Sequence, residues 1–282
     1  MKKLTLFLAV FALCFITNAQ VTTPQASPSA ELEFKVGLTD IEIEYSRPNA
    51  SGRTIFGDLV PFGKIWRTGA NKNTTISFSD DVIIDGQTLK AGKYAIFTKP
   101  EKSSWEVYFY SDNENWGVPQ KWDESKIAAK TTVQALQLPM NIETFAISID
   151  DLTYDSAKLN FLWEKTYVEV KINVPTDKKV MNSIENAKSA GFTSQDYLAA
   201  ANYYYTNGKD IKQAKKWIDE GMKLNKDPKF YQFRQQALIY AKSGDKKGAI
   251  RLAKQSLEGA KKAGNNDYIK MNEASLKEWG AK

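Results

Sequence analysis

The residues best suited to binding chemistry gather in the segment from Tyr45 to Thr75, which reads YSRPNASGRTIFGDLVPFGKIWRTGANKNTT. The segment combines three arginines with four glycines and two prolines. A loop rich in glycine and arginine can present planar guanidinium groups for bidentate contact with a carboxylate or a phosphate. One interpretation is therefore a pocket for an acidic or sugar-like small ligand. The candidate ligand-binding residues are Arg47, Arg53, Trp66, Arg67, Asn71 and Trp116.

The same arginines also allow a structural interpretation. They would pair with partly buried carboxylates such as Glu44 or Asp58 and hold the long loop to the sheet, because charges that leave water need partners. The aromatic residues of the segment would then cover the end of the sheet. Both interpretations stay open at this point.

Four tryptophans pose a similar choice. A carbohydrate-stacking platform is one possibility, and Trp116 and Trp122 are its better candidates because they belong to a longer loop, residues 112–126. Aromatic residues that alternate along strands more often fill a core. The full set is Trp105, Trp116, Trp122 and Trp163.

The composition removes several classes of catalyst. The chain has no histidine, and its one cysteine, Cys14, lies in the apolar stretch near the N-terminus. Serine triads, cysteine–histidine nucleophiles and the usual zinc sites therefore have no residues to build them. We expect a non-catalytic binding or scaffold protein without a cofactor or a metal. The alternative is a glycan-active enzyme whose acid and base are carboxylates or tyrosine. Such an enzyme would need a cleft that holds two facing carboxylates.

The loop segment carries a resemblance to a known family. The strings YSRP, GRTIFG, LVP and WRTGAN, followed by DGQTLKAGKYAIFTKP, resemble the domain of unknown function 2911 family over about residues 26–172. The resemblance implies a β-sandwich-like domain of bacterial envelope proteins, with neither an assigned activity nor established catalytic residues. Its signature positions in this sequence are Arg47, Arg53, Gly57, Trp66, Arg67, Gly69 and Asn71.

The elements that must position these residues are short strands. Apolar residues recur at every second position in sets such as Leu32-Phe34-Val36 and Phe145-Ile147-Ile149, with turn signals such as Asp85-Gly86 between sets. This period is typical of strands with one buried face. We therefore predict an antiparallel β-sandwich or barrel-like domain over residues 31–174.

After Pro175 the apolar period becomes helical, and we predict a helical module over residues 176–282. Its pattern repeats after 35 residues, so that Leu198 matches Phe233 and Trp217 matches Leu252. This spacing resembles tetratricopeptide repeats, which stack helix pairs of about 34 residues. Such modules commonly dock partners, and we expect a protein or peptide partner to bind through residues 193–264.

Charge divides at the same point of the chain. Residues 20–175 carry 16 Lys and Arg against 21 Asp and Glu, a balance of −5, whereas residues 176–282 carry 21 against 12, a balance of +9. The basic half favours an acidic partner, although such lysines are also typical of solvated helix faces. We expect no nucleic-acid partner, because the tail lacks interleaved aromatic platforms.

The N-terminus predicts export. Lys2 and Lys3 precede an apolar run from Leu4 to Ile16, and Thr17 and Ala19 supply the small residues of a cleavage site. We predict a signal peptide over residues 1–19, cleaved near Ala19-Gln20, and a flexible lead-in over residues 20–30. The run is too short to cross a membrane, so we expect a periplasmic or secreted protein without a membrane span.

Overall fold

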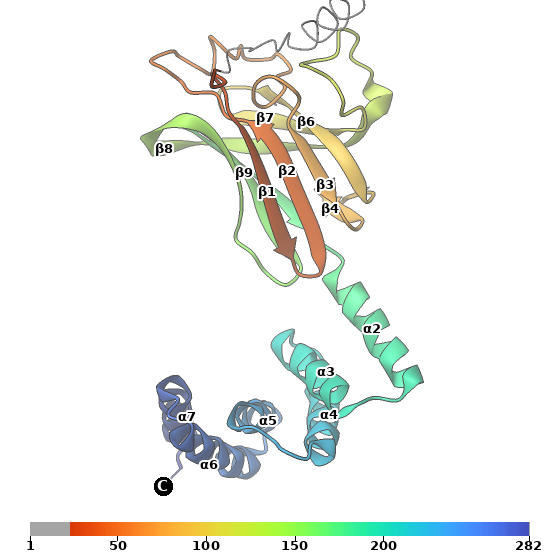
Figure 1. Ribbon diagram of the computed structural model, residues 1–282, viewed down its shortest axis with the longest axis vertical. Helices are drawn as coiled ribbons and strands as arrows, with labels where there is room; N and C mark the ends of the chain where they lie inside the picture. Colours follow the sequence, from red (N-terminus) through yellow and green to blue (C-terminus); the bar gives the residue numbers. More distant parts are fainter. Residues whose placement is uncertain (1–22, 282) are drawn as a thin grey trace, which may run out of the picture. The chain divides into compact units, whose positions relative to one another are not determined.

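The computed structural model describes residues 23–281, and the chain divides after Thr176 into two compact units. The first, called the sheet unit below, is built of strands, and the second, called the helical unit, is built of α-helices (Figure 1). The predicted order of a β domain followed by an α domain is confirmed. The predicted signal peptide lies outside the described residues.

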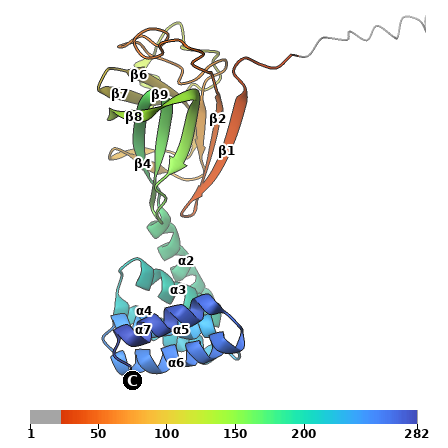
Figure 2. The ribbon, with the colours of Figure 1, turned by 90° about the vertical axis from the view of Figure 1, so that its left-hand side faces the viewer.

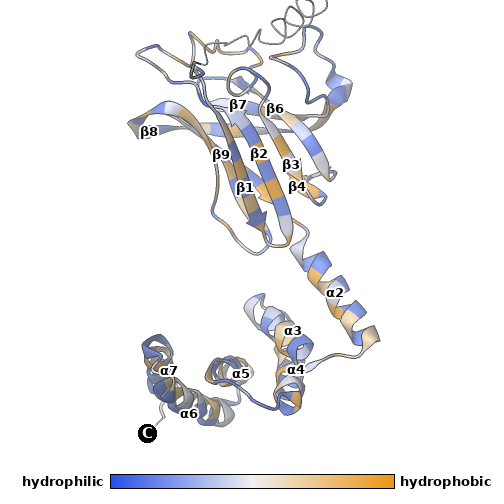
Figure 3. Cartoon of the chain, viewed as in Figure 1, coloured by the Kyte–Doolittle hydropathy of each residue, from blue (hydrophilic) through white to orange (hydrophobic). Residues whose placement is uncertain are grey.

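Nine strands of the described chain form one antiparallel sheet in the order β1-β2-β3-β6-β7-β8-β9-β4-β5. The strands are β1 Ser29–Val36, β2 Thr39–Ser46, β3 Thr75–Phe78, β4 Val82–Ile84, β5 Gln87–Leu89, β6 Gly92–Pro100, β7 Ser104–Tyr110, β8 Ile127–Asp150 and β9 Ser156–Asn173. Apolar and polar residues alternate along them, as the colours of Figure 3 show. This alternation gives the sheet one apolar face to bury.

One hydrophobic core lies inside the sheet, and each of the nine strands contributes at least one buried apolar side chain to it. A smaller cluster covers the opposite face of β6 and β7. There Phe97, Tyr108 and Tyr110 are buried, and Trp122 from the loop after β7 packs on them. The loop that carries the predicted Trp116 and Trp122 is therefore held to the sheet by one of its two tryptophans.

Strand β9 changes its buried face halfway along its length. Leu159, Phe161 and Trp163 are buried at odd positions, whereas Val168 and Val170 are buried at even positions. Between these sets the pairing with β8 is irregular, and Glu164 adopts a positive φ of 50°. An irregularity of this kind moves the following side chains to the other face. Between the two sets Lys165 has no paired residue on β8, whereas Glu164 pairs with Ile142 and Thr166 pairs with Gln137.

The helical unit contains six helices among its described residues: α2 Thr176–Ala190, α3 Ser194–Thr206, α4 Ile211–Leu224, α5 Phe230–Lys242, α6 Lys246–Lys262 and α7 Asn266–Glu278. Side chains cap several of the helix starts. Thr193 and Asp196 form a capping box at the start of α3, and Asp210 and Asp245 cap α4 and α6. These caps satisfy backbone N–H groups that have no partner within the helix.

The helices α3 to α7 lie side by side in one bundle (Figure 2). A hydrogen bond joins each helix pair: the Ser194 hydroxyl of α3 donates to the Gly221 carbonyl of α4 at 2.8 Å, and the Ser256 hydroxyl of α6 donates to the Phe230 carbonyl of α5 at 2.7 Å. Gly221 and Ser256 are 35 residues apart. The pairs α3–α4 and α5–α6 therefore have the spacing of the sequence period.

Candidate functional sites

The three arginines of the predicted pocket donate to backbone carbonyls. Arg47 Nε donates to the Phe145 carbonyl at 3.3 Å, and Arg53 Nε donates to the Ala50 carbonyl at 2.9 Å. Arg67 Nη1 donates to the Asn71 carbonyl at 2.8 Å. None of the three forms an ion pair within residues 23–281.

The carboxylates suggested as their partners have other environments. Glu44 forms its ion pair with Lys93, and Asp58 is exposed. The suggested ion pairs with Glu44 and Asp58 are therefore wrong. Arg47 nevertheless ties the loop to β8, whereas Arg53 and Arg67 donate to carbonyls of the loop itself. Backbone carbonyls accept strong hydrogen bonds from a charged guanidinium.

Arg67 and Asn71 lie together, and Arg53 lies apart from them. Asn71 adopts a positive φ of 57°, and its amide donates to the Ser27 carbonyl and the Ser46 hydroxyl. The Arg67 guanidinium packs over Gly117, where a Cβ would lie 3.4 Å from its Nη1. The neighbouring Trp116 side chain is 77% exposed. The structure thus joins Arg67, Asn71 and the 112–117 loop.

Trp66 belongs to an aromatic cluster at the end of the core. It stacks on Trp163 and contacts Trp105, Phe56 and Phe145 edge-on, with ring centroids 5.2–6.2 Å apart. Trp105 and Trp163 are each 2% exposed, and Trp122 stacks on Tyr110. The four suggested platform tryptophans do not form one surface, because two fill the core and a third covers the sheet.

Asn73, in the 45–75 loop, was not among the candidate residues predicted from the sequence. Its side-chain amide is buried and has no hydrogen-bond partner among the described residues. A hollow of about 420 Å³ adjoins Asn73, Ser46 and Glu44. Both polar atoms of the amide are nevertheless out of reach of solvent, so a ligand in the hollow could not touch them.

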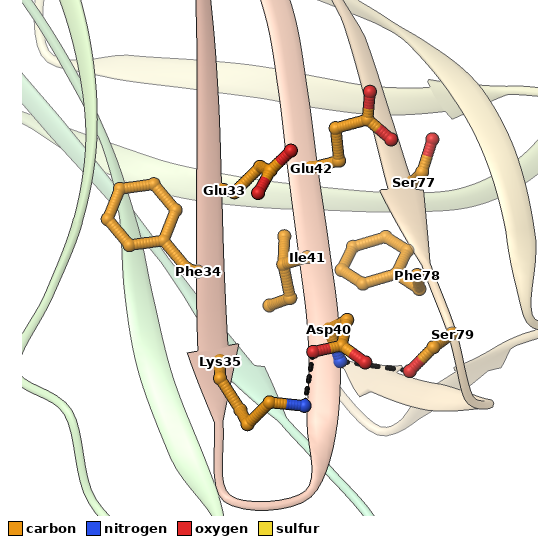
Figure 4. A pocket seen from close by; sticks show the side chains of 9 residues that line it. All are labelled: Glu33, Phe34, Lys35, Asp40, Ile41, Glu42, Ser77, Phe78 and Ser79. Carbon is orange, nitrogen blue, oxygen red and sulfur yellow. Dashed lines mark hydrogen bonds and ion pairs between the residues drawn. The ribbon is translucent and has the colours of Figure 1, made fainter.

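A second hollow, of about 580 Å³, lies over the outer faces of β1, β2 and β3 (Figure 4). Glu33 and Glu42 face each other across the strand pair, and Lys35 forms an ion pair with Asp40. The next acid along β1, Glu31, has its pKa raised by a shared hydrogen bond with Glu42 and by neighbouring carboxylates. Like charges opposite each other weaken a sheet, and this face presents few donors for a ligand.

A third hollow combines aromatic and polar groups, and we call it the aromatic cleft. It has a volume of about 470 Å³ and is lined by Phe56, Phe62, Glu101, Lys102, Trp105, Ala135, Gln137, Asn141, Glu164, Lys165 and Thr166. The lining comes from the 45–75 loop, the turn between β6 and β7, and the irregular part of β8 and β9. Its volume falls within the range of small-molecule sites.

Glu164 connects the walls of the aromatic cleft. Its carboxylate accepts a hydrogen bond from the Phe56 backbone N–H at 3.4 Å, which ties β9 to the loop. A non-glycine residue at positive φ costs about 1 kcal/mol, and such residues gather at functional positions. Glu164 was not among the site residues predicted from the sequence. The change from odd to even apolar positions in β9 nevertheless marks the irregularity that contains it.

The helical unit carries a groove of about 540 Å³, which we call the carboxamide groove. It is lined by Ser194, Gln195, Leu198, Ala199, Asn202, Asn225, Tyr231, Gln232 and Gln235. The residues come from α3, α5 and the loop before α5. Asn225 donates to Gln232, whereas the side chains of Gln195, Asn202 and Gln235 have no hydrogen-bond partner among the described residues. Free carboxamides offer both donors and acceptors.

Arg234 belongs to the same helix, α5, as the groove residues Tyr231 and Gln235, and its guanidinium is directed to α7. It is partly buried, and its guanidinium donates to Asn272 at 3.2 Å and to Ser275 at 3.4 Å. Both acceptors are neutral, and burial lowers the pKa of Arg234. Arg234 is therefore a cation that no carboxylate of the described chain neutralises.

Two further searches concern metals and membranes. Residues 23–281 contain no group of three or more acidic, histidine or cysteine side chains that could hold a metal ion. Within the same part of the chain, no helix is both long enough and apolar enough to span a membrane.

Comparison with known proteins covers the sheet unit. Residues 27–172 match the model of a family described as Protein of unknown function (DUF2911). Searches of the curated proteins and of the solved structures found no match. The matched region begins just before β1 and ends within β9, so it includes the aromatic cleft and leaves out the carboxamide groove.

Proposed function

The chain belongs to the DUF2911 family of proteins of unknown function, and we propose that it is an exported, non-catalytic binding protein whose helical unit docks a polypeptide partner. The carboxamide groove carries this proposal. An extended polypeptide presents alternating N–H and C=O groups, and side-chain carboxamides can bond to both. Gln195, Asn202 and Gln235 are free for this purpose among the described residues.

The charge of the helical unit favours an acidic partner. Residues 176–282 carry a balance of +9, and Arg234, on the same helix as the groove residues Tyr231 and Gln235, has only neutral partners. A carboxylate of the partner would neutralise a guanidinium that is already partly out of water, and such charge-assisted bonds are roughly twice as strong as neutral ones. The partner is therefore an extended segment with at least one acidic residue.

The repeated helix pairs support the same role. The period of 35 residues, which relates Gly221 of α4 to Ser256 of α6, and the hydrogen bond within each helix pair favour a tetratricopeptide-like module, in which stacked hairpins present a continuous face. The predicted signal peptide supports a periplasmic or secreted location, where the partner would be another exported protein.

The experiment uses the mature chain and peptides selected from a displayed library of random 12-residue sequences. Binding of selected peptides is then measured by fluorescence anisotropy for the wild type, for Asn202→Ala/Gln235→Ala and for Arg234→Gln. We expect acidic peptides to be selected, and each variant to weaken binding by about tenfold. In Asn202→Ala/Gln235→Ala this is the effect of the lost neutral hydrogen bonds, and in Arg234→Gln it is the effect of one lost hydrogen bond between charged groups.

The matched control is Gln255→Ala, which removes an exposed carboxamide from α6 outside the groove. It should bind peptides like the wild type. Equal affinity of all variants would overturn the groove as the docking site. Selection of basic or neutral peptides would overturn the acidic character of the partner.

The glycan-active alternative has one observation in its favour, because Glu101 and Glu164 both line the aromatic cleft. Carboxylates across a cleft are the pair that glycoside hydrolysis needs. The test is release of new reducing ends from oligosaccharides by the wild type, Glu101→Gln and Glu164→Gln. Turnover that both variants abolish would support the enzyme, and absence of turnover by the wild type would leave the cleft a binding site at most.

A further inference from the structure

We propose that the aromatic cleft of the sheet unit binds an uncharged saccharide. This site is separate from the carboxamide groove, and the inference concerns binding alone, so it does not depend on the docking role or on turnover. It rests on an apolar wall held rigidly in place, a set of free hydrogen-bonding groups and a balance of charges.

The apolar wall is formed by Phe56 and Phe62 over the buried Trp105. Phe56 packs against Trp105 with ring centroids 4.9 Å apart and against Trp163 with centroids 6.3 Å apart. Phe62 lies against Gly57, where a Cβ would come within 2.7 Å of its ring. Both phenylalanines remain partly exposed. An aromatic ring fixed on one side and open on the other is suited to stack on the C–H face of a sugar ring.

The polar wall supplies free donors and acceptors. The side chains of Gln137, Asn141 and Thr166 have no hydrogen-bond partner among the described residues, and neither do Lys102 and Lys165. Elsewhere in the sheet unit, charged side chains form networks, such as Glu106 with Lys99 and Lys130. The groups of the cleft are thus free to bond to the hydroxyls of a ligand.

The charged side chains that line the cleft disfavour a charged ligand. Glu101 and Glu164 are matched by Lys102 and Lys165, so the lining has no net charge. An anionic or cationic ligand would meet like charges as well as opposite ones, whereas hydroxyl groups can donate to the carboxylates and accept from the lysines. A neutral polyhydroxylated ring fits both walls.

The position of Glu164 links the shape of the cleft to the fold. Its positive φ of 50° and the irregular pairing of β8 with β9 leave residues 138–141 outside the ladder. Asn141 lies at the end of that stretch, and Gln137 lies just before it. The irregularity therefore produces the polar wall at the same point where Glu164 is tied to Phe56.

The experiment titrates the mature chain with maltotriose, cellotriose and N,N′,N″-triacetylchitotriose, three neutral oligosaccharides, and measures heat and tryptophan fluorescence. We expect at least one to bind with a Kd at or below about 1 mM. Trigalacturonate and chitosan trimer serve as the anionic and cationic counterparts, and both should bind at least about tenfold more weakly.

Two variants locate the site. Phe62→Ala removes the stacking surface and should weaken binding by about tenfold. Gln137→Ala/Asn141→Ala removes exposed side chains without protein partners, so it should fold normally and also weaken binding by about tenfold. Tyr154→Ala, an exposed aromatic outside the cleft, is the matched control and should bind like the wild type.

Three results would overturn the inference. The first is that none of the three neutral oligosaccharides binds at about 10 mM, ten times the expected Kd. The second is binding that neither cleft variant weakens, and the third is a charged trimer that binds as tightly as the neutral ones. Peptide docking by the same preparations is measured in parallel, so that a failure here is distinguishable from a failure of the groove.

Discussion

The indole rings of Trp66 and Trp163 stack with their centroids 5.8 Å apart and their planes 20° apart. Trp66 comes from the arginine-rich loop and Trp163 from β9, so the pair joins the loop to the sheet. The Trp66 indole N–H also donates to the Gly69 carbonyl at 3.2 Å. This residue was a ligand-binding candidate on the sequence, and its contacts assign it a packing role.

The first prediction follows from these contacts. Trp66→Ala should lower the free energy of unfolding by about 3 kcal/mol, because it removes a large side chain from four aromatic neighbours and leaves a cavity. Urea unfolding monitored by circular dichroism measures the loss. Trp116→Ala, at a side chain that is 77% exposed, is the matched control and should change stability by less than about 0.5 kcal/mol. Equal losses in the two variants would contradict the packing role.

The second prediction concerns acid stability. Hydrogen bonds from Lys130 and Lys99 hold the pKa of Glu106 at about 2, with a further bond from Tyr108 at 3.0 Å. A carboxyl pKa that is depressed in the folded state stabilises the fold above its unfolded value of 4.5, and the contribution is lost as the pH falls towards 2. The side chain is 22% exposed, so solvent screening reduces the contribution to about 1–2 kcal/mol.

Glu106→Gln tests this contribution at two pH values. The variant should be less stable than the wild type by about 1–2 kcal/mol at pH 7, and the difference should fall to a few tenths of a kcal/mol (roughly 0.4) near pH 2, where about half of the wild-type carboxyl is protonated. Asp40→Asn breaks the exposed pair with Lys35 and should cost less than about 0.5 kcal/mol at either pH. A Glu106→Gln deficit that is the same at both pH values would exclude the proposed linkage.

Local patterns were sufficient to predict the two classes of element. Strand alternation identified Phe145, Ile147 and Ile149 as a buried face, and the helical period after Pro175 indicated the helices, because both signals depend on near neighbours in the chain. The short strands β4 and β5 were not predicted, because three residues are too few to show an alternating pattern. The turn at Asp85-Gly86 between them was nevertheless recognised from its residues, and both adopt positive φ.

The sites were harder to predict, because their residues meet only after folding. The aromatic cleft joins Phe56 to Glu164, which are 108 positions apart, and no local pattern reports that distance. The partners of the arginines were predicted wrongly for a related reason. Charge alone suggested carboxylates, whereas the loop brought the guanidinium groups next to carbonyls of their own and neighbouring segments.

The last prediction tests the close packing of α3 on α4. Gly221 is buried, and an added Cβ would lie 2.9 Å from the Leu198 side chain and 3.0 Å from Tyr197. In a free helix, Gly→Ala gains about 1 kcal/mol, but overpacking costs about 1–3 kcal/mol, so the two effects oppose each other. Here the contact is with the body of Leu198, and we expect Gly221→Ala to lower the unfolding free energy of the helical unit by about 1–2 kcal/mol.

A double variant separates the two effects. Leu198→Ala alone should destabilise the unit, because it removes a mostly buried side chain, but it also removes the atoms that the new Cβ would meet. In the Leu198→Ala background, Gly221→Ala should therefore cost much less, and the helix preference for alanine should bring its effect close to zero. Urea unfolding followed by circular dichroism at 222 nm gives all four stabilities. Simple additivity of the two substitutions would show that Gly221 is not required by the approach of Leu198.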